Sequence, residues 1–154
     1  MSFTLSSAAF PPRGRIPAVH SCDGDNASPP LVWSRTPAGT RSFALVCTDP
    51  DAPVGTWYHW AVFDIPGDLE SLPMGFATEA HVGSLRQAIN DFKRTGYGGP
   101  CPPRGHGVHH YHFRLLALSV AHLELPDPVE CRDVEREATK HLLGQAELIG
   151  TYAR

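Results

Sequence analysis

Two short stretches hold most of the residues in this chain that could do chemistry. Residues 47–60 read Cys-Thr-Asp-Pro-Asp-Ala-Pro-Val-Gly-Thr-Trp-Tyr-His-Trp, and residues 97–111 read Tyr-Gly-Gly-Pro-Cys-Pro-Pro-Arg-Gly-His-Gly-Val-His-His-Tyr. Each stretch joins a turn rich in proline and glycine to a strand that carries ionisable side chains. Acids, histidines and a tyrosine that converge in this way would form a small polar pocket suited to an anion.

Strand alternation predicts which of these side chains face the core. Successive side chains of a strand point to opposite faces, so Asp49 shares a face with the apolar Cys47. The same rule puts His109 and Tyr111 on the core side of their strand, and the other side then carries His110, His112 and Arg114.

His59 lies in a strand in which nearly every residue is apolar, and alternation places it on the face of Ala61 and Phe63. A single histidine or aspartate at a strand end is usually a turn-former or a hydrogen-bonded core group. Three such residues in phase with the core, each beside a loop rich in proline or glycine, favour a pocket floor.

The loop Gly96–Gly107 contains five glycines and three prolines in twelve residues. Glycines allow positive φ and let backbone N–H groups form an anion-binding nest, while prolines stiffen the loop. The loop has no phosphate-loop lysine and no strand–loop–helix setting, so nucleotide hydrolysis is not indicated. A rigid connection without a ligand is the alternative interpretation.

Length and composition predict one domain, 1–154, of ordinary globular character. Hydrophobic residues make up 42% of the 154 residues, and 14 glycines with 15 prolines favour a β architecture with many loops. The net charge of −3 and the lack of a basic run argue against nucleic acid as a partner. No apolar run reaches the roughly 20 residues of a membrane span, and the first residues do not resemble a signal peptide, so we expect a cytoplasmic protein.

The four cysteines, at positions 22, 47, 101 and 131, show no metal-binding spacing. A domain of this size does not need disulfides, so we expect four free thiols. Cys47 has apolar neighbours and should be inert, whereas Cys101 lies on the glycine-rich loop. His110 and His112 share a strand face, but exposed strand histidines are more often solvated than ligating. We therefore expect neither a metal nor a cofactor.

The pattern of apolar residues and turns predicts a mainly β fold, a two-sheet antiparallel sandwich of Greek-key type with one C-terminal helix. The expected strands are Phe3–Ala9, Ile16–His20, Leu31–Trp33, Ser42–Asp49, Trp57–Ile65, Leu85–Ile89, Val108–Val120 and Ala146–Tyr152.

The helix is expected over residues 128–143, with Asp127 as its N-cap, Glu130 in a capping box and Gly144 as its C-terminal stop. The tight turn in Asp-Pro-Asp-Ala-Pro makes Ala52–Pro53 a candidate cis peptide bond.

These motifs resemble the two signature motifs of the phosphatidylethanolamine-binding protein (PEBP) family, in particular its bacterial and archaeal branch of Raf-kinase-inhibitor-like proteins. The segment Asp25–Trp33, with its Ser-Pro-Pro-Leu-Val-Trp, and Asn90-Asp91-Phe92 resemble further parts of the family pattern. The resemblance covers most of the chain. It implies an anion pocket formed by Asp49, Asp51, His59, His109 and Tyr111, with Pro102 on its rim.

One residue departs from the family pattern. The second motif usually reads His-Arg-Tyr, and here it reads His109-His110-Tyr111. Losing the arginine removes a permanent charge and a bidentate donor, so ligand preference or rigidity of the pocket should differ.

The favoured interpretation is a non-catalytic binding or regulatory protein whose pocket takes a phosphate, phosphoethanolamine or similar anionic group. Two alternatives stay open. One is an acid–base enzyme that uses Asp49, His59, His109 and Tyr111 on a small metabolite. The other, which family membership permits, is a kinase or protease inhibitor acting through surface loops. The sequence leaves the oligomeric state open, a homodimer included.

Overall fold

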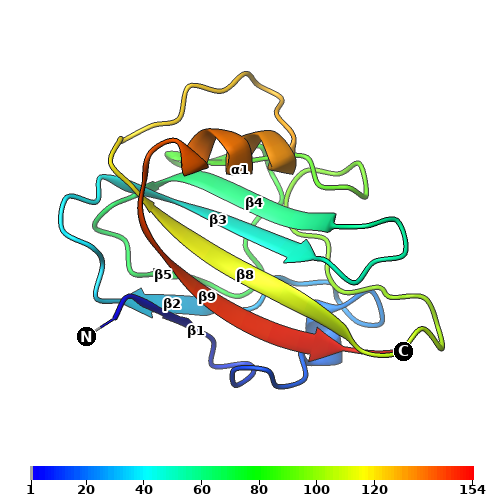
Figure 1. Cartoon of the computed structure of the whole chain (residues 1–154). Helices are drawn as coiled ribbons and strands as arrows, with labels where there is room; N and C mark the ends of the chain where they lie inside the picture. Colours follow the sequence, from blue (N-terminus) through cyan, green and yellow to red (C-terminus); the bar gives the residue numbers. More distant parts are fainter. Residues whose placement is uncertain (1) are drawn as a thin grey trace.

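The computed structural model describes residues 2–154 and contains two antiparallel sheets and one α-helix (Figure 1). The small sheet has the order β1 (Thr4–Ser6), β2 (Leu31–Ser34), β5 (Ser71–Leu72). The large sheet has the order β6 (His81–Val82), β7 (Leu85–Gln87), β4 (Trp57–Pro66), β3 (Ser42–Asp49), β8 (His109–Leu118), β9 (Leu142–Tyr152). The helix α1 spans Cys131–Thr139, and a 3-10 turn spans Ala18–His20.

The large sheet is buried on both faces, which makes the fold three layers thick. One face packs against the small sheet through Phe43, Leu45 and their neighbours. The other face packs against α1, which contributes Val134 and Ala138 to a second apolar cluster. Every residue of the central strand β3 is therefore buried. Full burial of one large apolar side chain stabilises a fold by about 1.5–3 kcal/mol, so these two clusters hold the strands in place.

The expected mainly β sandwich with a C-terminal helix on one side is confirmed. Ser42–Asp49 has the predicted bounds, and the strands expected at Trp57–Ile65 and Val108–Val120 differ from β4 and β8 by one or two residues at an end. The first strand is shorter than expected, at Thr4–Ser6. Ile16–His20 is not a strand, because proline 17 precedes a 3-10 turn in which the His20 N–H donates back to the Pro17 carbonyl.

The helix begins later than predicted. Its N-cap is Glu130, whose side chain makes no capping bond, and Asp127 contacts His81 instead. The backbone before the helix is extended because Val129 accepts from the Ile89 N–H, and the Cys131 N–H donates to Ile89. This bridge to another segment excludes helical geometry at residues 128–130.

The helix also ends earlier, at Thr139, and Gly144 is not its stop. Gly144 lies within β9 and pairs with Ala117 of β8. The long strand β8 offers hydrogen-bonding groups as far as Leu118, which pairs with Leu142. Sheet pairing thus extends β9 toward the helix beyond the predicted start at Ala146.

The prediction of a cis Ala52–Pro53 bond is wrong. Within residues 2–154 the cis peptide bond joins Asp127 and Pro128. The turn after β3 reverses by other means, because the Asp51 N–H donates to Oδ1 of Asp49 and Gly55 adopts a φ of 100°. Positive φ is accessible to glycine without steric cost.

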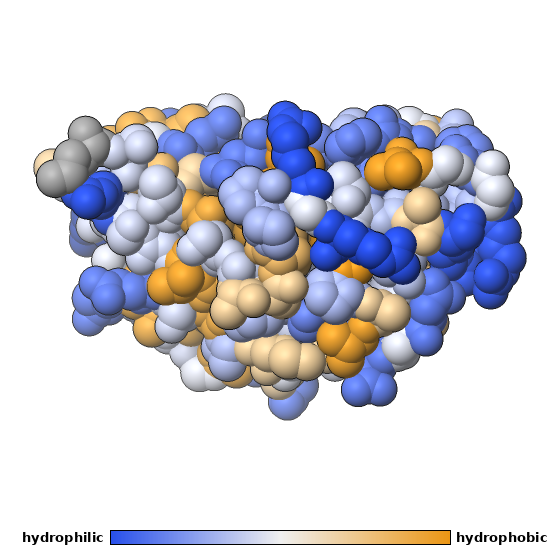
Figure 2. Space-filling view, turned by 90° about the horizontal axis from the view of Figure 1, so that it is seen from below, coloured by the Kyte–Doolittle hydropathy of each residue, from blue (hydrophilic) through white to orange (hydrophobic). Residues whose placement is uncertain are grey.

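No helix within residues 2–154 is long and apolar enough to span a bilayer. On the face seen from below, polar and apolar side chains are mixed (Figure 2).

Candidate functional site: a histidine-floored pocket

A β-bulge in β4 positions the first histidine of the site. Cys47 pairs with Trp60 and Thr48 pairs with Tyr58, so His59 is an extra residue between the two pairs. A bulge directs two neighbouring side chains toward one face of the sheet. His59 and Trp60 accordingly both lie on the side of the sheet that faces the small sheet.

The predicted phase of His59 is therefore wrong. Ala61 and Phe63 belong to the cluster under α1, whereas the His59 ring packs edge-on against Tyr111 at a centroid distance of 5.2 Å. Simple alternation fails because it does not account for the bulge. His59 therefore contacts Tyr111 in the site and does not point toward α1.

The structure brings four of the expected polar residues to the floor of one cavity of about 210 Å³, formed by Asp49, His59, His109 and Tyr111. Its walls are mostly apolar and consist of Ala52, Pro53, Val54, Trp57, Phe92, Cys101, Pro102 and Pro103. Pro102 is the residue that the family resemblance places on the rim. This volume is below the roughly 300–1,000 Å³ of pockets for drug-sized ligands. It suits a small polar group attached to an apolar or extended remainder.

Asp49 orients His109 through one of its two carboxylate oxygens. Its Oδ2 lies 2.6 Å from Nδ1 of His109, and its Oδ1 accepts the Asp51 N–H at 2.8 Å. Both side chains are buried, with 3% of Asp49 and 1% of His109 exposed. A carboxylate only accepts, so Nδ1 of His109 carries the hydrogen in this contact.

Asp51 lies outside the cavity, in contrast to the expectation. Its carboxylate is 41% exposed and receives the His110 backbone N–H at 2.9 Å, and Nδ1 of His110 lies 2.8 Å away. The hydrogen bond from His110 lowers the pKa of Asp51 below its ordinary value. Asp51 therefore connects the turn that follows β3 to His110 of β8, outside the cavity.

His59 is held in one tautomer. Its Nδ1 lies 2.6 Å from the Gly98 carbonyl, which only accepts, so Nδ1 carries the hydrogen. Burial lowers the pKa of His59 below its ordinary value, although the bond to Gly98 opposes this shift. At neutral pH the ring is therefore uncharged, and Nε2, the nitrogen left for a ligand, is an acceptor.

Tyr111 supplies a hydroxyl without a partner. Only 1% of the residue is exposed, and its hydroxyl is buried without a hydrogen bond to any part of the chain between residues 2 and 154. Burial, assisted by the nearby Asp49, raises the pKa of the phenol above its ordinary value. The group therefore stays protonated and can donate to a ligand oxygen.

The glycine-rich loop packs closely and does not form the expected anion nest in its first half. The Gly98 N–H donates to the His59 carbonyl, and the Gly99 N–H donates to Oδ1 of Asn26. A Cβ on Gly98 would lie 2.5 Å from the Phe92 ring, and one on Gly99 would lie 2.1 Å from the His20 carbonyl oxygen. These glycines allow close approach, and their N–H groups are already used.

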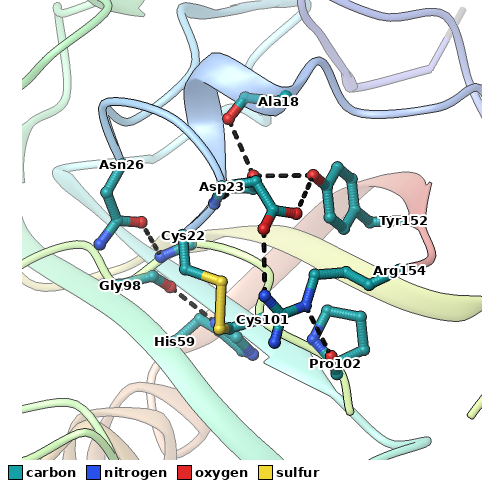
Figure 3. Close-up of a disulfide and its surroundings, with 12 residues drawn as sticks. Ala18, Cys22, Asp23, Asn26, His59, Gly98, Cys101, Pro102, Tyr152 and Arg154 are labelled. Carbon is teal, nitrogen blue, oxygen red and sulfur yellow. Dashed lines mark hydrogen bonds and ion pairs between the residues drawn. A yellow bond between two sulfur atoms is a disulfide. The ribbon is translucent and has the colours of Figure 1, made fainter. Parts of the chain in front are cut away.

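A disulfide between Cys22 and Cys101 fixes the rim of the cavity (Figure 3). The expectation of four free thiols is therefore wrong, and Cys47 and Cys131 are the free cysteines. Close packing of the loop against residues 20–26 brings the two sulfurs together, including the 3.0 Å bond from the Cys22 N–H to the Pro100 carbonyl. Burial raises the pKa of both free thiols well above the ordinary value, which leaves them unreactive.

Arg154 braces the same rim. Nε of Arg154 donates to the Pro102 carbonyl at 2.9 Å, and Nη1 donates to Asp23 at 3.0 Å (Figure 3). Asp23 also accepts the Tyr152 hydroxyl at 2.6 Å. Strand β9, the loop and the segment after residue 20 are thus joined beside the disulfide.

Sequence reasoning missed His106. Its Nδ1 lies 2.6 Å from Nε2 of His109, on the edge of that ring opposite Asp49. The available signal was a histidine three residues before His109 within a loop rich in glycine. Among the described residues, no cluster of three or more His, Cys, Asp or Glu side chains has the arrangement of a metal site.

Comparisons with known proteins found a matching family model and similar sequences. A family model described as phosphatidylethanolamine-binding protein matches residues 6–153. The UPF0098 protein of Aquifex aeolicus is 48% identical over 148 residues, which cover 96% of this chain and 86% of that protein. The putative lipoprotein LppC of Mycobacterium tuberculosis is 40% identical over 151 residues, covering 97% of this chain and 71% of the relative.

Among solved structures, Escherichia coli YbcL, described as a member of the mammalian PEBP family, matches with a TM-score of 0.93. The two sequences are 32% identical, and the match covers 100% of this chain and 99% of the other. Because the family model matches residues 6–153 and this solved family member has the same fold, the chain belongs to the phosphatidylethanolamine-binding protein family.

Proposed function

We propose that the protein is a non-catalytic binding protein whose cavity takes a small oxyanion, a phosphate or a phosphoryl head group such as that of phosphoethanolamine. The observation that carries this proposal is the buried hydroxyl of Tyr111, which has no partner among residues 2–154. Leaving such a group unsatisfied costs about 1–3 kcal/mol. A ligand oxygen in the cavity would satisfy it.

The other groups on the floor complement this donor. Nε2 of His59 accepts at neutral pH, so a phosphoryl group that keeps one hydrogen can bond to both residues. The cavity is lined by no lysine or arginine, and its floor includes the carboxylate of Asp49. A fully ionised ligand would therefore bind weakly near neutral pH, and affinity should rise with protonation of the site or of the ligand.

Two observations favour binding over the acid–base enzyme. His109 could act as a base through Nε2, but this atom is engaged by Nδ1 of His106 at 2.6 Å, so neither nitrogen of His109 is free to take a proton unless His106 is displaced. The free thiols Cys47 and Cys131 are buried with raised pKa values, so they are poor nucleophiles. A kinase or protease partner on the surface loops stays a prediction of the family resemblance.

The Tyr111→Phe variant tests the proposal. It removes only the hydroxyl, so affinity for inorganic phosphate and phosphoethanolamine should fall by about 1.5–3 kcal/mol, the range for bonds to charged groups. Stability should stay equal or rise, because an unsatisfied buried group is removed. Titration calorimetry and urea unfolding measure the two effects. Unchanged affinity, or a variant that loses stability, would assign the hydroxyl a structural role and contradict the proposal.

The cytoplasmic location expected from the sequence stays a prediction, and the disulfide weighs against it. Disulfides persist mainly in oxidising compartments, with intracellular proteins of hyperthermophiles as an exception. Cell fractionation combined with alkylation of free thiols would establish both the compartment and the redox state of Cys22 and Cys101 in the cell.

A further inference from the structure

Both nitrogens of His109 are engaged within the protein. Nδ1 contacts Asp49 at 2.6 Å, and Nε2 lies 2.6 Å from Nδ1 of His106. The two imidazole rings meet edge-on with centroids 4.9 Å apart. One hydrogen lies between the two facing nitrogens, whichever ring carries it. A ligand can therefore bond to His109 only in the position that His106 occupies.

His106 sits between two glycines that can reorient it. Gly105 and Gly107 have φ values of 76° and 93°, and a Cβ at either position would meet nothing within 4 Å. The His106 backbone is held by its N–H donating to the Pro103 carbonyl at 3.1 Å. Glycine crosses between regions of φ and ψ at low cost, so the exposed ring can swing out while the loop base stays fixed.

The base of the loop is anchored on the side of the cavity. The Gly105 N–H donates to the Arg154 carbonyl at 3.0 Å, and Cys101 is tied to Cys22. The backbone that leads into His106 is thereby held, so reorientation of the ring requires changes only in the His106 side chain and at Gly107. The rim formed by Pro102 does not have to move with it.

We propose that His106 is a gate residue, an internal substitute ligand that occupies the hydrogen-bonding position on His109 and is displaced when a phosphoryl group binds. This inference rests on the proposed function. Hydrogen phosphate carries both a hydroxyl and ionised oxygens, so it can replace His106 whether the shared hydrogen stays on His109 or leaves with His106. The Gly105-His106-Gly107 segment thus sets affinity and specificity in addition to the floor residues.

The gate predicts that removing His106 strengthens binding. In His106→Ala no internal group competes for Nε2 of His109, and inorganic phosphate should bind about 2- to 10-fold more tightly, the worth of one released hydrogen bond. His109→Ala should bind phosphate more weakly than wild type. His112→Ala, on the outer face of β8, is the matched histidine control and should equal wild type.

Calorimetric titration of inorganic phosphate into these four proteins separates the two hypotheses. Weaker or unchanged binding by His106→Ala, together with a loss in His109→Ala, would overturn the gate while the binding function stands. Equal affinity of His109→Ala and wild type, or no phosphate binding by any of the four proteins, would overturn both.

Nitrogen-detected NMR of the histidine rings gives a direct second reading. Saturating phosphate should move the Nδ1 shift of His106 to that of a solvated histidine and change the Nε2 shift of His109. A His106 resonance that stays unchanged at saturation means that the ring is not displaced, and the gate is then rejected.

Discussion

Asp49 and His109 lie at the ends of neighbouring strands, β3 and β8, and their side chains meet 2.6 Å apart although 60 residues separate them in the chain. The contact aligns the His109 ring so that its other nitrogen points toward His106. Asp49 thus acts through the His109 ring that it orients.

His109→Ala should weaken phosphate binding, because a hydrogen bond to a charged ligand, worth about 1.5–3 kcal/mol, is lost. The net loss is smaller than this value by the worth of the His106 bond that the ligand displaces in the wild type. His112→Ala should change it by less than about 0.5 kcal/mol, as is usual for surface changes. His112 lies on the opposite side of β8 and contacts Glu147, 3.1 Å away. Equal losses in both variants would mean that the pocket is elsewhere.

Phosphate should bind more tightly than sulfate. Neutral His59 offers an acceptor, Nε2, and sulfate has no hydrogen to give it near neutral pH, whereas a phosphoryl group has its second pKa at about 6. At about pH 6 we expect roughly a tenfold preference, equivalent to about 1.4 kcal/mol. Competition between the two ions, followed by calorimetry, measures it. Equal affinities would show that His59 does not contact the ligand.

Phosphate affinity should also be higher at about pH 5.5 than at about pH 8, since histidine protonates near 6.5 and only the cation donates from both nitrogens. Because the pKa of His59 is lowered, this residue protonates, and adds to the affinity for phosphate, only in more acidic solution. Titrations at the two pH values decide the direction. Tighter binding in alkaline solution would exclude the histidines as donors.

Stability should fall on acidification partly because of His59. The folded pKa lies below the unfolded value of about 6.5, so the unfolded state holds more protons between the two values. Above about pH 6.5, neutral His59 makes its full contribution to the free energy of unfolding. This contribution is lost as the pH falls toward the pKa of His59 in the folded state. Urea unfolding from about pH 7.5 to 5 should show a smaller loss for His59→Gln than for wild type. Parallel curves would assign the loss to other groups.

The unreduced, denatured protein should contain two thiols that react with Ellman's reagent, those of Cys47 and Cys131. Four reactive thiols would contradict the Cys22–Cys101 disulfide. Because this bond closes a loop of 79 residues, Cys101→Ser should lower the free energy of unfolding by about 2–4 kcal/mol. Cys131→Ser, a buried cysteine outside the disulfide, separates the loss of the cross-link from the loss of a packed thiol.

The sequence predicts those parts of the site that depend on local pattern. Asp49, His109 and Tyr111 lie on the predicted face because β3 and the start of β8 alternate regularly. His59 departs from prediction because a bulge depends on how β4 pairs with β3, which local sequence does not encode. The late start of α1 has the same origin, a backbone bridge to Ile89 about 40 residues earlier.

The disulfide and the gate residue were missed for a different reason. Cys22 and Cys101 are 79 residues apart, and no short spacing marks them as partners. His106 was visible in the sequence as one of several exposed loop residues, but its importance comes from the direction of the His109 ring. That direction is set by Asp49 on another strand, so it appears only once both strands are placed.

Arg154 has a practical consequence for experiments on this protein. Its side chain holds Pro102 and Asp23, and its carbonyl holds Gly105, so residue 154 braces the rim of the proposed binding site. A tag or sensor surface attached after this residue would lie next to the rim and change the measured affinities. Attachment ahead of β1, which starts near the opposite end of the molecule (Figure 1), keeps the handle away from the ligand.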